Sequence, residues 1–267
     1  MNRTGFVEGL MRQRMVHVRE RARVRVAAYQ APLHATTSDG ILGLIREQVE
    51  VCAAQGVEIL CCPEAVLGGL ADYASRPLDI ALAGQLQARL APLASDRVAV
   101  VLGFTELRNG RLFNAAAVFH KGSIAGIYRK MHPAIHTSIY DPGDATAVFT
   151  VGELTFGIII CRDSTYREPA RTMASRGATM LFVPTNNGLP IGKAGPELVA
   201  ESRDCDIALA RENGVFVVRA DVAGQTENLL SYGASAIVDP DGRVLQSARP
   251  LSADLIVAEI MTGARSG

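Results

Sequence analysis

The sequence contains no tryptophan, few aromatic residues (5%) and no excess of either charge, since 27 basic side chains balance 27 acidic ones. A balanced charge excludes a global field that would recruit nucleic acid or an acidic membrane. No run approaches the roughly 20 apolar residues that span a bilayer, and the densest apolar stretch is residues 154–161. We therefore expect neither nucleic acid nor a membrane as a partner.

The sequence also lacks a CxxC pair, a Walker-type phosphate loop and a G-x-G-x-x-G motif. Phosphate and dinucleotide cofactors therefore have no support, and we expect no cofactor. The five cysteines are an odd number without regular spacing, which argues against a disulfide scaffold and favours a cytoplasmic location. His132 and His136 are four positions apart, but Pro133 and the lack of acidic ligands close by argue against a metal site.

The composition is that of a folded chain, with 48% hydrophobic and 20% charged residues. Residues 1–25 carry seven arginines against Glu8 and Glu20, a net charge of +5. The glutamates and the shortage of serine argue against a transit peptide. We therefore predict a basic N-terminal extension over residues 1–23 and one domain over residues 24–262, because no repeat or low-complexity linker divides the chain.

Strand-like and helix-like segments alternate along the chain. The pattern predicts βαβ units mixed with hairpins, and it closes with a β-meander over residues 231–238, 243–247 and 253–260. The other predicted strands are residues 24–29, 57–62, 98–104, 112–119, 123–128, 147–151, 154–161, 179–183 and 215–220, and the predicted helices are 39–55, 78–93, 166–176 and 197–213. This mixture favours an α/β fold, a sandwich of two sheets with helices outside.

Three apolar strands end in a residue that is able to do chemistry. Glu64 follows the strand that stops at Pro63, Lys130 follows a strand that ends before Pro133, and Cys161 closes an almost purely apolar strand. Strand ends in α/β folds converge on ligand crevices. A cysteine at a strand-to-helix turn suits a nucleophile, because the helix N-terminus favours the thiolate.

Taken in order, these segments resemble the nitrilase superfamily of carbon-nitrogen hydrolases, whose pattern is Pro-Glu, then Tyr-Arg-Lys-x-His, then an apolar strand ending in Cys. The resemblance extends from about Val24 through nearly the whole remaining chain. The other matching stretches are residues 103–106 with Asn114, 141–144, 176–178, 183–185, 210–213, 233–235 and 238–242.

The resemblance implies a four-layer αββα sandwich of two mixed β-sheets flanked by helices, with residues 24–262 as a single carbon-nitrogen hydrolase domain. It implies that Glu64 is the general base, Cys161 the nucleophile and Lys130 the partner of the tetrahedral intermediate. It also implies pairing of subunits, so we expect a homodimer or a higher homo-oligomer. The expected reaction is hydrolysis of a small linear amide through a thioester, with release of ammonia.

The sequence departs from the family pattern at two places. Many members carry a second glutamate about six residues before the Pro-Gly pair, and that position is His136 here. Members that cleave nitriles have tryptophan after the cysteine, whereas this chain has Arg162. The second departure favours an amide or carbamoyl substrate over a nitrile.

The remaining candidates are substrate-binding residues. His136 would orient Lys130 or the substrate, Arg162 would bind a substrate carboxylate or form a structural salt bridge, and Asn186 and Asn187 would line the pocket or form only a turn. The alternatives to the amidase are an N-carbamoyl amino-acid amidohydrolase, a nitrilase, and a non-catalytic descendant that binds a small molecule.

Overall fold

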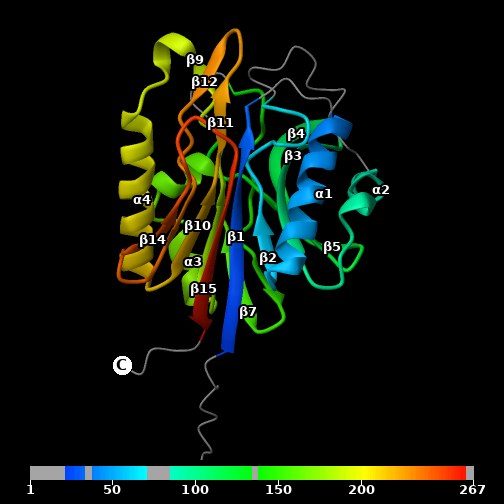
Figure 1. Cartoon of the computed structure of the whole chain (residues 1–267), viewed down its shortest axis with the longest axis vertical. Helices are drawn as coiled ribbons and strands as arrows, with labels where there is room; N and C mark the ends of the chain where they lie inside the picture. Colours follow the sequence, from blue (N-terminus) through cyan, green and yellow to red (C-terminus); the bar gives the residue numbers. More distant parts are fainter. Residues whose placement is uncertain (1–21, 34–37, 71–84, 134–137, 263–267) are drawn as a thin grey trace, which may run out of the picture.

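A computed structural model describes residues 22–33, 38–70, 85–133 and 138–262. Two β-sheets pack face to face between two layers of helices, with α1 and α2 on one outer side and α3 and α4 on the other (Figure 1). The helices are α1 (Ser38–Ala54), α2 (Leu86–Leu90), α3 (Ala170–Ser175) and α4 (Glu197–Asn213), with short 3-10 turns at Ala91–Leu93, Cys161–Thr165 and Ile191–Lys193. This arrangement confirms the predicted αββα sandwich.

The larger sheet has nine strands in the order β5-β4-β3-β2-β1-β11-β12-β9, and β15 also pairs with β1. Its core is parallel where β1, β2 and β3 meet, and antiparallel at the β3-β4-β5 hairpins. The strands are β1 (Ala22–Pro32), β2 (Ile59–Cys61), β3 (Ala99–Arg108), β4 (Arg111–His120), β5 (Ser123–Arg129), β9 (Leu189–Pro190), β11 (Val222–Gln225), β12 (Leu229–Ser231) and β15 (Asp254–Thr262).

The smaller sheet has six strands in the order β14-β13-β10-β8-β7-β6. β7, β8 and β10 run parallel, and hairpins close both edges. Its strands are β6 (Val148–Val151), β7 (Leu154–Ile158), β8 (Met180–Pro184), β10 (Phe216–Ala220), β13 (Ala236–Val238) and β14 (Val244–Ser247). The parallel strands are buried on both faces, which explains why they read as continuous apolar runs.

The core has two parts because the larger sheet buries both of its faces. Alternate residues such as Val26 and Val101 face the smaller sheet and pack in one cluster with Phe156 and Phe182. Their neighbours along the strands face outward and join the apolar stripe of α1, which includes Ile45. Successive residues of a central strand therefore face the smaller sheet and the layer of α1 in turn.

Several predicted elements differ from the observed ones in their bounds, and three of these differences concern the segments around the site and the outer helices. The strand predicted over residues 154–161 ends at Ile158, because the Asp163 carboxylate accepts the N–H of Ile160 at 3.0 Å and draws the chain into a 3-10 turn. The helix predicted over residues 166–176 begins only at Ala170, after Pro169. Of the helix predicted over residues 78–93, the part before residue 85 lies outside the described residues, and the rest forms α2 and a 3-10 turn.

The predicted closing meander is wrong in its connectivity. Residues 231–238 divide between β12 in the larger sheet and β13 in the smaller one, with Gly233 at φ +79° between them. The last strand, β15, crosses to the larger sheet and pairs antiparallel with β1 over its whole length. Only the β13-β14 hairpin of the predicted meander forms.

Within the described residues, no helix is long and apolar enough to cross a membrane.

Candidate active site

Glu64 follows Pro63 just after the end of β2, and it is almost wholly buried. Its backbone N–H donates to the carbonyl of Thr185, the residue after β8, at 3.2 Å. The ends of β2 and β8, one strand from each sheet, therefore fix the backbone of Glu64.

Gly103 in β3 makes room for the bend that carries Glu64. A Cβ at this position would lie 2.7 Å from the Cα of Glu64 and closer still to the backbone of Pro63 and Ala65. Such contacts are shorter than real Cβ atoms make, so the bend requires glycine here. The matching stretch of residues 103–106 therefore needs its glycine for a backbone reason.

Lys130 follows β5 and directs its side chain between the sheets, where it is almost wholly buried. Its Nζ atom lies 2.6 Å from Oε1 of Glu64. Burial alone disfavours the ammonium form, but the neighbouring carboxylate of Glu64 outweighs it and holds the pKa of Lys130 above its ordinary value. The pair is therefore an ammonium and a carboxylate in contact away from water.

Two further donors hold the Glu64 carboxylate. Nδ2 of Asn114 in β4 donates to Oε1 at 2.6 Å, and the backbone N–H of Asn186 donates to Oε2 at 3.0 Å. With Lys130, three of the roughly four acceptor positions of a carboxylate are occupied. One position is left to accept a proton.

Cys161 begins the 3-10 turn after β7 and is partly buried, whereas Cys61 and Cys62 are fully buried. Its backbone is left-handed, with φ +43°, which is rare for a residue with a side chain and is common at functional sites. Burial raises the pKa of the Cys161 thiol to about 12, and the charge of Glu64 adds to that rise, whereas Lys130 and Arg219 lower it. The thiol therefore lies within the electrostatic reach of both other predicted triad members.

Asp163 holds this turn against β5 and was not singled out from the sequence. Its buried carboxylate accepts from the hydroxyl of Tyr128 at 2.8 Å and from the backbone N–H of His132 at 2.8 Å. Nδ1 of His132 lies 3.0 Å from the same carboxylate. An acidic residue therefore lies beside His132, although it is distant in sequence. Among the described residues, however, no three potential ligands are arranged to hold a metal ion.

The other predicted site residues lie in different surroundings. Nη2 of Arg162 donates to the hydroxyl of Tyr166 at 3.2 Å, and the ring of Tyr166 stacks on His132 with centroids 3.7 Å apart. Asn186 contacts Glu64 through its backbone N–H and also through its side chain, whose Nδ2 donates to the Glu64 carbonyl at 3.5 Å. His136 lies outside the described residues, so its role stays a prediction.

Asn187 turns toward a buried acid instead. Its backbone N–H and Nδ2 donate to the two oxygens of Asp221, at 2.9 and 3.0 Å. The same carboxylate accepts the backbone N–H of Val222 and Ala234. Burial raises the pKa of Asp221 to about 6, although these backbone donors act in the opposite direction.

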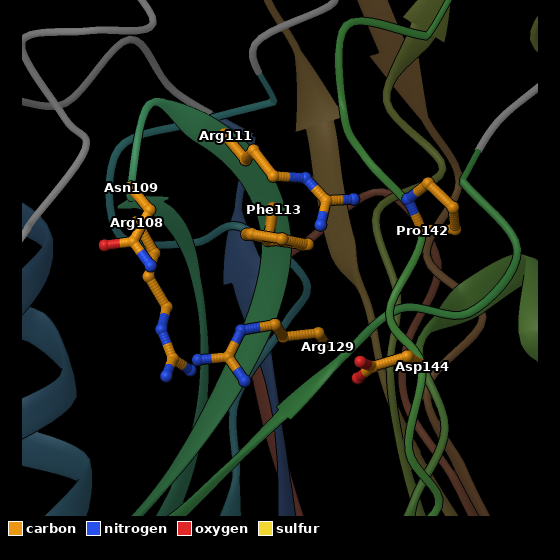
Figure 2. A pocket seen from close by; sticks show the side chains of 7 residues that line it. All are labelled: Arg108, Asn109, Arg111, Phe113, Arg129, Pro142 and Asp144. Carbon is orange, nitrogen blue, oxygen red and sulfur yellow. The ribbon is translucent and has the colours of Figure 1, made fainter.

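Figure 2 shows a separate surface pocket, with a volume of about 280 Å³. Its lining residues are Arg108, Asn109, Arg111, Phe113, Arg129, Pro142 and Asp144. Phe113 and Arg129 directly precede Asn114 and Lys130, so strand alternation sends them to the opposite face. Arg129 pairs with Glu106 at 2.5 and 2.7 Å and Arg111 with Asp141 at 3.2 Å, so two of the pocket's cations are already paired.

Comparison with known proteins agrees with this fold. The model of the carbon-nitrogen hydrolase family matches residues 25–265. An (R)-stereoselective amidase of Pseudomonas sp. is 32% identical over 75% of this chain and 72% of its own length. A nitrilase of Pyrococcus abyssi is 28% identical over 89% of both chains. A solved Nesterenkonia AN1 amidase from the nitrilase superfamily superposes with a TM-score of 0.77 at 23% identity, over 89% of this chain and 90% of its own.

A longer relative matches over only part of its length. The chain is 29% identical to a glutamine-dependent NAD(+) synthetase of Xanthomonas campestris over 91% of its residues, but spans 45% of that protein.

The two packed sheets and their outer helices are the sandwich of nitrilase-superfamily enzymes. The chain belongs to the carbon-nitrogen hydrolase family. Membership confirms the resemblance drawn from the three strand ends, and it confirms the predicted enzyme class.

Proposed function

We propose that the protein hydrolyses the carbon-nitrogen bond of a small linear amide, with Cys161 as nucleophile, Glu64 as general base and acid, and Lys130 as the cation that stabilises the intermediate. The observation that carries this proposal is the buried contact between Lys130 and Glu64, 2.6 Å apart, within electrostatic reach of the partly buried thiol. Burying two opposite charges is costly. Both charges act on the thiol of Cys161, which gives a catalytic reason to keep them buried.

The first half of the reaction forms a thioester. Glu64 takes the thiol proton, the sulfur of Cys161 bonds to the carbonyl carbon, and the carbonyl π electrons move to oxygen. The ammonium group of Lys130 stabilises this oxyanion. The carbon-nitrogen bond then breaks, and Glu64 returns its proton to the nitrogen, which leaves as ammonia.

The second half consumes water. Glu64 takes one proton from a water molecule, whose oxygen attacks the thioester carbon. The new intermediate expels the sulfur, and the proton on Glu64 restores the thiol of Cys161. The sum is one amide and one water converted to one carboxylic acid and one ammonia. A thiol whose pKa burial raises to about 12 needs this adjacent base in order to react near neutral pH.

One further contact favours an amide over a nitrile. Oδ1 of Asn114 is buried and has no hydrogen-bond donor among the described residues, while Nδ2 of the same side chain holds Glu64. A buried acceptor without a donor costs about 1–3 kcal/mol. An amide nitrogen brings two N–H donors, whereas a nitrile nitrogen brings none. Oδ1 of Asn114 would therefore accept a hydrogen bond from an amide substrate and gain none from a nitrile.

The test is ammonia release from a panel of short aliphatic amides, glutamine, N-carbamoyl amino acids and the nitriles that match the amides. We expect kcat/KM to be highest within the amides. Higher kcat/KM on the nitriles would refute the amide assignment, and selective turnover of the carbamoyl compounds would replace it with the carbamoylase.

Cysteine variants test the nucleophile on the best substrate of that panel. Cys161→Ala should fold and lose turnover, whereas Cys62→Ala should stay active, because the Cys62 side chain is fully buried in the core beside α1. Activity that survives in Cys161→Ala and disappears in Cys62→Ala would show that the nucleophile is assigned to the wrong residue.

A further inference from the structure

Arg219 in β10 is a fully buried arginine that the reaction described above does not use. Asp206 of α4, also fully buried, accepts from Nε at 3.0 and 2.9 Å and from Nη2 at 2.6 Å. The guanidinium group therefore has one fixed orientation, set by a carboxylate on the outer helix layer.

The rest of the guanidinium group points to the two strand ends of the candidate site. Nη2 donates to the hydroxyl of Ser164 at 3.1 Å, and Ser164 lies in the 3-10 turn that begins at Cys161. Nη1 donates to the hydroxyl of Thr185 at 2.7 Å. A single side chain thus bridges the turn of the thiol and the end of β8.

Thr185 passes this contact on to Glu64. Its carbonyl accepts the backbone N–H of Glu64 at 3.2 Å, and the next residue, Asn186, donates its N–H to Oε2 of the Glu64 carboxylate at 3.0 Å. The peptide group between Thr185 and Asn186 therefore hydrogen-bonds both the backbone and the carboxylate of Glu64, and Arg219 holds the Thr185 side chain next to it.

Protein stability alone is a weak explanation for the buried ion pair of Arg219 and Asp206. Apolar residues of similar volume in place of a buried ion pair are often as stable or more stable. Two hydrogen bonds of Arg219, by contrast, end on Ser164 in the turn of the thiol and on Thr185, whose carbonyl accepts the N–H of Glu64.

We propose that Arg219, oriented by Asp206, is a positioning residue for catalysis that sets the placement of the Cys161 turn relative to Glu64 and supplies a positive charge at that turn. This inference rests on the proposed function of Cys161 and Glu64. The charged groups that interact with the thiol are Glu64, Lys130, Arg219 and Asp221, two acids and two bases. Without Arg219 this balance shifts toward the acids, which disfavours the thiolate.

The experiment replaces the pair by apolar residues of similar total volume, Asp206→Leu/Arg219→Met, in the full chain. The rate at which iodoacetamide alkylates Cys161 is followed as a function of pH by mass spectrometry of the peptide that contains it. We expect alkylation near neutral pH to be about tenfold slower than in the unchanged protein. Only the thiolate reacts, and a rise of about one unit in the pKa of Cys161 lowers its thiolate fraction about tenfold.

A second pair serves as the matched control. Arg129 and Glu106 form a similar two-bond contact one residue from Lys130, on the opposite face of the sheet. Glu106→Leu/Arg129→Met should therefore leave the alkylation profile of Cys161 unchanged. If both double variants slow alkylation equally, the effect is a general loosening and the inference is overturned.

Arg219→Lys tests placement apart from charge. It keeps the cation but cannot reach Ser164, Thr185 and Asp206 with one rigid fork. We expect alkylation within about twofold of the unchanged protein, and kcat lower by about tenfold or more because misplaced groups react slowly. An unchanged kcat in this variant, together with an unchanged alkylation profile in Asp206→Leu/Arg219→Met, would reduce Arg219 to structural support and overturn the proposal.

The alkylation readout separates this inference from the proposed function. If the unchanged protein hydrolyses no amide on the panel while its alkylation still depends on Arg219, the proposed function fails and the electrostatic role of Arg219 stands. If amides are hydrolysed and alkylation ignores Arg219, the inference alone fails.

Discussion

The Nζ atom of Lys130 lies 2.6 Å from Oε1 of Glu64, and the two side chains are buried together where β5 and β2 end. Removing one partner of a buried ion pair leaves the other charge uncompensated, which costs about 3–5 kcal/mol. This contact therefore couples the stability of the protein to its chemistry.

A double-mutant cycle on this pair separates the two effects. Lys130→Met should lose both stability and activity, and Glu64→Gln should lose activity by about 10² or more, the usual contribution of a general base. Glu64→Gln/Lys130→Met should recover stability in urea unfolding and stay inactive. Turnover in that double variant would show that the chemistry lies elsewhere.

Gly103 supports a prediction on backbone room. Gly103→Ala should lower both activity and stability, because the new Cβ pushes against the bend at Glu64. Gly43 in α1 is the control, since a Cβ there meets nothing within 4 Å. Gly43→Ala should stabilise the helix by about 0.5–1 kcal/mol. Thermal unfolding of both variants checks the pair, and an equal response would contradict the assigned role of Gly103.

Arg162 supports a prediction on substrate charge. Its guanidinium donates to Tyr166 and is free to pair with a carboxylate at the same time, since it has several donors. Arg162→Ala should raise KM for amides that carry a carboxylate and leave neutral amides unchanged. Tyr166→Phe, which removes only the hydrogen bond, should change KM far less. An unchanged substrate ranking in Arg162→Ala would remove this residue from recognition.

Asp221 gives the stability a defined dependence on pH. Burial raises the pKa of this carboxyl to about 6 in the folded protein, whereas an unfolded aspartate has a pKa of about 3.9. The folded state therefore holds the proton more tightly. The contribution of Asp221 to stability falls as pH rises from about 4 to about 6.

Asp221→Asn cannot ionise, so urea unfolding across this pH range should lose that slope. Asp254 provides a contrast of opposite sign, because Arg249 and backbone N–H donors lower its pKa despite partial burial. Its contribution to stability is lost as pH falls, and Asp254→Asn should remove that loss. A slope that is unchanged in Asp221→Asn would show that another group titrates.

His136 supports a prediction on activity. A protonated imidazole at the place of the missing glutamate would add positive charge beside Lys130 and disfavour its ammonium form. Activity should then fall below about pH 6.5, the ordinary histidine value. His136→Asn should abolish this acid limb. If Asp221→Asn abolishes it instead, the titrating group is the buried acid behind Asn187.

The sequence indicates those parts of the candidate site that depend on local pattern. Glu64, Lys130 and Cys161 each follow an apolar strand, and strand ends in this fold class meet at one edge. α4 was predicted from residue 197 to 213 because its periodic pattern stops at Gly214, which is left-handed with φ +65°. These features need only neighbouring residues to be recognised.

Other features depend on contacts between distant segments. Nothing in the local sequence distinguishes Arg219 or Asp206 from solvated charges, because their burial follows from the packing of α4 on β10. Asp163 redirects the end of β7 through a hydrogen bond that apolar patterning does not reveal. The homodimer or higher homo-oligomer expected from the family resemblance stays a prediction.

The pairing of β15 with β1 has a consequence for how the chain reaches this fold. Arg25 and Glu259 contact each other across 234 positions of sequence. On a ribosome β1 emerges before its partners, and the edge of residues 22–30 has no partner until β15 is made. An open edge invites wrong pairing with other chains, and contacts this distant form slowly. This region of the fold is therefore completed only once β15 has been synthesised, and a chain cut before Asp254 is expected to aggregate.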